Sequence, residues 1–173
     1  MALYEFEGKR PVIDPTAFVP ETADVIGDVV IGAACFVGMG ARLRGDYGRV
    51  RIGDRTSVQE NVVIHARENG ETLVGSNVQL GHGCVLHNCT VKDNAVIGVG
   101  AILTDYSVVG DWAIVGEGAV VRGEVPDGKI AVGVPAKVIG DVTDRQKTEW
   151  QYYKDKYADL AATRYPAGLR RIG

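Results

Sequence analysis

The sequence has few of the features that mark membrane, secreted or nucleic-acid-binding proteins. No apolar run approaches the roughly 20 residues of a membrane-spanning helix, and the N-terminal segment MALYEFEGKR lacks the apolar core of a signal peptide. The formal net charge is −3, from 19 basic and 22 acidic residues, so no basic surface for nucleic acid is indicated. We therefore expect a cytoplasmic protein that binds neither membranes nor nucleic acid.

Cysteine and aromatic residues are also scarce. The three cysteines, Cys35, Cys84 and Cys89, form no Cys-x-x-Cys pair, so we interpret them as buried free thiols and not as a secreted disulfide framework. Aromatic residues make up 7% while glycine numbers 23, a composition that favours tightly wound β-structure over a helical bundle. The chain of 173 residues is long enough for one domain with its own core.

What the sequence does contain is a six-residue repeat. An aliphatic residue recurs at every sixth position, with two insertions and one step of five residues, and a small residue often follows four places later. Neither a 3.6-residue helix nor an alternating strand produces this period over about a hundred residues. The aliphatic positions are Val19, Val25, Ile31, Val37, Leu43, Ile52, Val58, Ile64, Val74, Leu80, Leu86, Val91, Ile97, Leu103, Val109, Val115 and Val121.

A period of six predicts a parallel β-helix, in which each hexad forms a short strand and a turn and three hexads complete a triangular coil. The repeat resembles that of the left-handed β-helix family of hexapeptide-repeat proteins. The left hand is implied by this resemblance, because the usual crossover rule predicts the other hand. We expect an all-β fold, with a β-helix over about residues 12–140 of a single domain spanning 1–173.

A helix is expected to close the chain over about residues 143–164. Thr143 and Gln146 fit a capping box, and Pro166 marks a break shortly after the pattern ends. We expect the helix to pack its aromatic face against the β-helix wall. The residues at helical spacing are Trp150, Tyr153, Tyr157 and Leu160.

The only three histidines lie between Arg44 and His87, and counting hexads places them on the coil. Arg44, His65 and His87 each follow an aliphatic residue of one face, here face A, so they should form a column with neighbours about 4.8 Å apart. His82 falls on another face, face C, directly above Glu60. It therefore cannot join His65 and His87 within one chain.

A neighbouring subunit can supply His82 if face A of one molecule packs against face C of the next. Threefold closure of that contact predicts a homotrimer. Three histidines with an open position form the pattern of a catalytic zinc site, and Fe²⁺ and Co²⁺ also accept three imidazoles. The alternative is that His65, His82 and His87 are solvated turn residues.

The ordered motifs resemble the γ-class carbonic anhydrase family of hexapeptide-repeat proteins. The segment LRGDYGRV and the tryptophan-containing C-terminal helix are more similar still to a sub-branch that includes phenylacetate-degradation and carnitine-operon proteins. The resemblance extends over nearly the whole chain. The motifs that carry it are Arg44-Gly45-Asp46, Gln59-Glu60-Asn61, His65, and the pair His82 and His87.

The resemblance implies a role for most of these residues. His65 and His87 of one subunit and His82 of the next would bind Zn²⁺, or Fe²⁺ or Co²⁺. Gln59 would hold the metal-bound water by a hydrogen bond. Arg44 and Asp46 would organise the site and stabilise the interface, and Glu60 would lie close to them.

Four residues leave parts of this assignment open. Tyr47 stands where the best-studied type of the family has a second carboxylate. The loop Ala66–Leu73 contains Glu68, a candidate proton shuttle whose alternative is a solvated surface glutamate. Arg44 has an alternative as an interface ion-pair partner instead of a contact to bicarbonate. Tyr157 is a candidate site residue whose alternative is packing of the helix.

The resemblance implies reversible hydration of CO₂ to bicarbonate by metal-bound hydroxide, because metal coordination lowers the pKa of bound water to about 7. The same hydroxide could attack an acyl-CoA thioester, so a thioesterase is the first alternative. A hexapeptide acyltransferase, with a histidine base and no metal, is the second. A non-catalytic trimeric scaffold or binding protein is the third.

Overall fold

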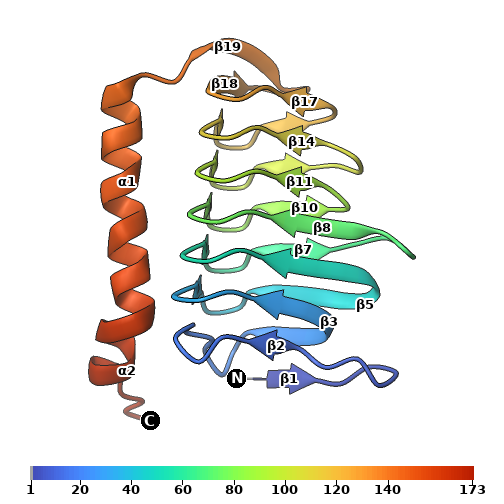
Figure 1. Cartoon of the computed structure of the whole chain (residues 1–173), viewed down its shortest axis with the longest axis vertical. Helices are drawn as coiled ribbons and strands as arrows, with labels where there is room; N and C mark the ends of the chain where they lie inside the picture. The colour runs from blue at the N-terminus through green and yellow to red at the C-terminus, as the bar shows by residue number, and fades with distance from the viewer. Residues whose placement is uncertain (1) are drawn as a thin grey trace.

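The computed structural model describes residues 2–173 and shows a left-handed parallel β-helix with a long helix beside it (Figure 1). Faces A and B belong to one sheet and face C to another. Face A contains β7 (Val63–His65), β10 (Val85–His87), β13 (Ile102–Leu103) and β16 (Val120–Val121). Face B contains β8 (Glu71–Val74), β11 (Thr90–Val91), β14 (Val108–Val109) and β17 (Glu124–Val125).

Face C and the lower end complete the coil. Face C contains β4 (Phe36–Val37), β6 (Ser57–Val58), β9 (Gln79–Leu80), β12 (Val96–Ile97), β15 (Ile114–Val115), β18 (Lys129–Val132) and the antiparallel β19 (Lys137–Asp141). The first coils contain β1 (Ala2–Tyr4), β2 (Val12–Ile13), β3 (Asp24–Ile31) and β5 (Arg42–Ile52). Strand β5 is long because it serves two faces, pairing with β7 through Arg42–Arg44 and with β8 through Arg49–Ile52.

The six-residue period is the reason for this fold. Leu43, Ile64 and Leu86 pair in register on face A and are fully buried, so each hexad places one aliphatic side chain in the interior. Asn61 and Gly83 occupy the same turn in successive coils with φ of 59° and 67°, a left-handed conformation that glycine and asparagine adopt most readily. The predicted fold class is confirmed.

The C-terminal helix α1 (Asp144–Asp159) begins with the predicted capping box of Thr143 and Gln146. It continues as the π-helical η1 (Leu160–Arg164) and the short α2 (Tyr165–Gly168). Figure 1 shows this helix running back along the coil, so that the C-terminus lies near the N-terminal strands. Among residues 2–173, no helix is both long and apolar enough to cross a membrane.

The face of α1 that meets the coil contains the predicted Tyr157, which packs on Phe36, together with residues that were not predicted. Lys154 and Ala158 are its buried residues, whereas Tyr153 is 46% exposed. The Lys154 Nζ donates to the carbonyl oxygen of Asn94 at 2.5 Å and lies 4.5 Å from the ring centroid of Trp112. Burial lowers the pKa of Lys154 to about 8. The helix is therefore held to the coil partly by a buried cation.

The three cysteines are free and buried, as expected. Burial is the main reason that the pKa of Cys35, Cys84 and Cys89 is raised to about 12. Because the thiolate is the reactive form, these side chains act as small core residues.

Candidate functional site

The predicted column on face A is confirmed. Arg44 pairs with His65, and His65 pairs with His87, on successive strands of the sheet. The two imidazole rings lie with centroids 5.2 Å apart and planes tilted by 40°. Each side chain points outward because it follows an interior aliphatic residue by one position, and side chains alternate along a strand.

His65 is held by a carboxylate that also binds an arginine. Its Nε2 lies 3.0 Å from Asp46 Oδ1, and Arg44 Nη1 donates to Asp46 Oδ2 at 2.6 Å. Burial lowers the pKa of His65, and the Arg44 charge adds to this effect. For Asp46, burial alone would raise the pKa, but hydrogen bonds from the Tyr47 amide, His65 and Arg44 outweigh it and the pKa is lowered.

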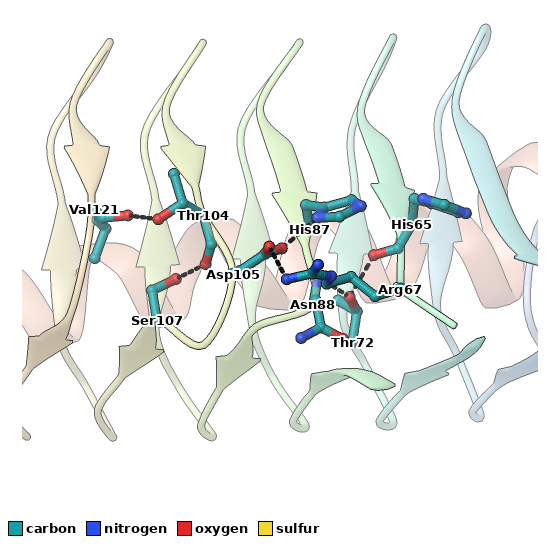
Figure 2. A network of polar contacts seen from close by, with 9 residues as sticks. All are labelled: His65, Arg67, Thr72, His87, Asn88, Thr104, Asp105, Ser107 and Val121. Carbon is teal, nitrogen blue, oxygen red and sulfur yellow. Dashed lines mark hydrogen bonds and ion pairs between the residues drawn. The ribbon is translucent and has the colours of Figure 1, made fainter. Parts of the chain in front are cut away.

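His87 has a matching pair of partners that the sequence analysis did not identify. Its Nδ1 lies 2.5 Å from Asp105 Oδ1, while Arg67 Nη1 donates to Asp105 Oδ2 at 3.0 Å (Figure 2). Asp105 follows Thr104, which continues the column above His87. Extending the hexad count by one coil would have placed Asp105 next to His87. Arg67 lies on an inserted loop, whose conformation no repeat specifies.

The backbone below these side chains is fixed by a threonine of face B. Thr72 Oγ1 donates to the carbonyl oxygen of His65 at 2.6 Å and accepts from the amide of Asn88 at 2.8 Å (Figure 2). Thr72 is fully buried. These bonds join the end of the inserted loop to the backbone at His65 and to the residue after His87, which limits movement of the site.

His82 lies away from this column, on the turn after β9 of face C, as predicted. Its Nδ1 lies 2.7 Å from Glu60 Oε2 directly below it. The buried Gln59 accepts from the backbone amide of His82 at 3.2 Å. Gln59 and Glu60 thus accompany His82, while Arg44 and Asp46 accompany His65.

Of the two other predicted site residues, Tyr157 lies beside Gln59 and Glu60 of the His82 group, whereas Glu68 lies apart from both groups. Tyr157 of α1 packs on Phe36 with ring centroids 5.1 Å apart. Burial, followed by the Glu60 charge, raises the pKa of Tyr157, and Gln59 acts in the opposite direction. Glu68 is exposed on the loop between β7 and β8. A role of Glu68 as a proton shuttle stays a prediction.

The free nitrogens of the imidazoles decide whether a metal ion fits. His65 binds its carboxylate through Nε2 and His87 through Nδ1, which leaves one ring nitrogen of each for a ligand. Within residues 2–173, however, no three histidine, cysteine, aspartate or glutamate side chains gather as a ligand set. Zinc binding by His65, His82 and His87 therefore needs a second subunit and stays a prediction.

Comparison with known proteins places this arrangement among hexapeptide-repeat proteins. No family model matches the sequence. A Bacillus cereus structure assigned as an acetyltransferase has a TM-score of 0.91 and 29% identity, covering 93% of this chain and 95% of its own. A hexapeptide transferase family protein from Anaplasma phagocytophilum has a TM-score of 0.89 and 33% identity, covering 92% and 96%. The carnitine operon protein CaiE of Salmonella typhimurium is 40% identical over 166 residues, which is 93% of this chain and 82% of CaiE.

These relatives correct the function expected from the resemblance. Reversible hydration of CO₂, and with it the assignment as a carbonic anhydrase or lyase, is wrong, because the near-full-length matches are a carnitine operon protein and members of a transferase family. The physical reason is that one coil geometry can place the same histidines for different chemistry. In this chain, His65, His82 and His87 each contact a carboxylate.

The relationship itself is established by its extent. The alignment to CaiE covers the repeats, both groups of histidines and the start of the closing helix, and the identity is too high over too long a span to reflect the repeat alone. The chain belongs to the carnitine-operon CaiE family, within the γ-class carbonic anhydrase-like hexapeptide-repeat proteins.

Proposed function

We propose that this protein is an acyltransferase, which moves an acyl group from a thioester donor such as acyl-CoA to an amine or hydroxyl acceptor. The observation that carries the proposal is the contact between His87 and Asp105. A carboxylate that holds one ring nitrogen of an imidazole leaves the other nitrogen oriented to act as a general base. The two transferase-family structures support the same class of reaction.

The step follows from this geometry. His87 Nε2 accepts the proton of the acceptor amine or hydroxyl as the acceptor atom attacks the thioester carbonyl carbon. The carbon–sulfur bond then breaks, and the imidazolium returns the proton to the departing thiolate. Asp105 stabilises the imidazolium between these events, and Arg67 holds the carboxylate in place from its other oxygen.

A hollow beside His87 offers room for the reacting groups. It has a volume of about 310 Å³, within the range of small-molecule pockets. His87 and Asp105 form its polar end, and Val85, Ile102 and Leu103 form an apolar wall that suits an acyl chain.

The proposal includes a homotrimer. Outside the hollow, an outward position of face A carries Val63, which is 40% exposed, and burial of such an apolar side chain between subunits is favourable. Packing of face A against the turn that carries His82 would bring the His82–Glu60 pair of one subunit to His65 and His87 of the next.

Zinc, or Fe²⁺ or Co²⁺, bound by His65, His87 and His82 of a neighbouring subunit is a separate proposal about the same atoms. When bound, such an ion supplies a Lewis acid. His87 Nε2 cannot coordinate an ion and accept a proton at the same time. Elemental analysis of the purified protein therefore distinguishes the two proposals.

The test of acyl transfer uses acetyl-CoA and other short acyl-CoA donors with a panel of amines and alcohols. The whole protein should release CoA in amounts that depend on the acceptor, and mass spectrometry should find the acylated product. His87→Ala should reduce this release by about 10²–10⁴-fold. Equal rates for His87→Ala and the wild type would contradict the proposal.

A further inference from the structure

A second hollow lies at the lower end of the coil, where the C-terminal tail returns to the first turns of the β-helix. Its volume is about 540 Å³. Figure 1 shows the end of the helix beside the N-terminal strands. One wall is apolar and comes from the coil and from the tail. The residues of that wall are Phe18, Val19, Pro20, Met39 and Leu169.

The apolar wall is firm because aromatic rings support it from behind. Phe18 stacks on Phe36 with centroids 5.9 Å apart and meets Tyr165 edge-on at 4.9 Å. Val19 and Pro20 are buried. A flat apolar group placed on this wall would therefore contact an ordered surface.

The remaining lining is mostly positive. Arg170 and Arg171 of the tail line the hollow, together with Glu21 and Thr22. Arg171 lies 3.6 Å from Glu21 and its Nε donates to the carbonyl oxygen of Gly173 at 2.7 Å, whereas Arg170 makes no ion pair among residues 2–173. Two guanidinium groups against one carboxylate leave a net positive charge, and guanidinium groups bind phosphate with paired hydrogen bonds.

The position of the hollow relates it to the histidine site. Phe18 bridges to Phe36, so Glu21 falls below Met39 on the same corner of the coil. The pairing of β4, β6 and β9 then places Met39 below Glu60, and Glu60 below His82. With neighbouring strands about 4.8 Å apart, two coil steps separate Met39 from His82 by roughly 10 Å.

We propose that this hollow binds the phosphorylated nucleotide end of the acyl thioester donor. The adenine would lie on the apolar wall and the phosphates would meet Arg170 and Arg171. The pantetheine arm would follow the corner past Met39 and Glu60 toward His82. This proposal rests on the proposed acyl transfer. A simple carboxylate or a free phosphate would leave the apolar wall without a contact, so the lining favours a nucleotide.

The test measures binding of CoA, pantetheine and 3′-phosphoadenosine 5′-phosphate to the whole protein by calorimetry. Arg170→Gln/Arg171→Gln should weaken CoA binding at least about tenfold and leave pantetheine binding unchanged, since pantetheine lacks the phosphates. The matched control is Arg145→Gln/Arg164→Gln, which removes two exposed arginines of the helix that do not line the hollow. It should bind CoA like the wild type.

Several results would overturn the proposal. One is wild-type binding of CoA no tighter than that of pantetheine, and another is equal CoA affinity in the tail variant and the wild type. Inorganic phosphate that competes as strongly as the nucleotide would show an anion site without nucleotide specificity.

Failure of the proposed function would look different. The protein would then transfer no acyl group from either acyl-CoA or acyl-pantetheine. Binding of 3′-phosphoadenosine 5′-phosphate, measured without turnover, would still decide the nucleotide site. If acyl-pantetheine is a substrate but the tail variant binds CoA normally, acyl transfer stands and the nucleotide site does not.

Discussion

Substitution of Asp105 tests the carboxylate that holds His87. Asp105→Asn keeps an oxygen that can accept from Nδ1 but removes the negative charge, whereas Asp105→Ala removes both. Asp105 also binds Arg67, so each change leaves that arginine without its carboxylate. If His87 acts as a general base, both variants should lower kcat and change the KM for the donor much less.

The magnitude follows from the geometry and the exposure of the pair. Opposite charges about 4 Å apart attract by roughly 1–4 kcal/mol at effective dielectric constants between 80 and 20. The His87 and Asp105 side chains are 40% and 33% exposed, so solvent screening places the pair near the lower end, at about 1 kcal/mol. Asp105→Asn should therefore reduce kcat by about five- to tenfold. Asp105→Ala also releases the ring and should reduce kcat by about 10²-fold.

The assay is steady-state release of CoA at saturating donor and acceptor, with circular dichroism to confirm folding. Asp159→Asn provides the control, because Asp159 is exposed on α1 and makes no ion pair in the described part of the chain. A kcat for Asp105→Ala within twofold of the wild type would refute the role of this carboxylate.

Three further predictions concern stability, reactivity and assembly. Burial lowers the pKa of Lys154 from 10.5 to about 8. Its contribution to the free energy of unfolding should therefore rise by at most about 3 kcal/mol between pH 8 and 10.5 and be lost as the pH falls through 8. Thermal melts of the wild type and Lys154→Met across this range measure this contribution, and an equal dependence of stability on pH in the two proteins would contradict it. The three buried thiols, with a pKa of about 12, should resist a thiol reagent at pH 8 until guanidinium unfolds the chain, and rapid labelling of the native protein would contradict this. Light scattering should give three times the chain mass. If zinc binds at the shared site, mixing His82→Ala with His87→Ala chains should restore part of the zinc binding that each variant loses, while a monomer that binds zinc through all three histidines would refute the shared site.

The sequence was sufficient to predict the parts of the fold that repeat. A hexad count placed His65 above Arg44 and His87 above His65, because one interior aliphatic residue per strand fixes the register of each coil on the next. The same count separated His82 from that column. Repetition converts a local pattern into long-range pairing, which a non-repetitive sequence does not provide.

Contacts that depend on single insertions or on helix docking could not be predicted in this way. Arg67 reaches Asp105 from a loop with no repeat, and Lys154 adds a buried cation to the helix contact that Tyr157 makes with the coil. Amphipathic spacing identified the helix and its cap but not its orientation, because a lysine that finds a carbonyl oxygen and an aromatic ring can occupy a buried position.

The error in predicted function has a chemical origin. A histidine beside a carboxylate is a metal ligand with a supporting partner in one protein and a general base in another, since both need one nitrogen held and the other free. His65 and His87 satisfy either requirement with the same atoms. Side-chain geometry is therefore compatible with both metal binding and general-base catalysis, and the identity of the substrate is needed to distinguish them.

The hollow at the lower end of the coil helps to distinguish these two classes of chemistry, because its lining favours one kind of substrate. Hydration of CO₂ needs no recognition beyond a few atoms, so it would give no role to a positive, partly apolar hollow two coil steps from His82. A thioester donor with a nucleotide end needs a reacting centre and a distant anchor joined by a flexible arm. Binding energy from such an anchor holds the reacting end in place and can be used to promote the chemical step. Loss of Arg170 and Arg171 should therefore lower kcat/KM for acyl-CoA but not for acyl-pantetheine, a contrast that a site for CO₂ would not produce.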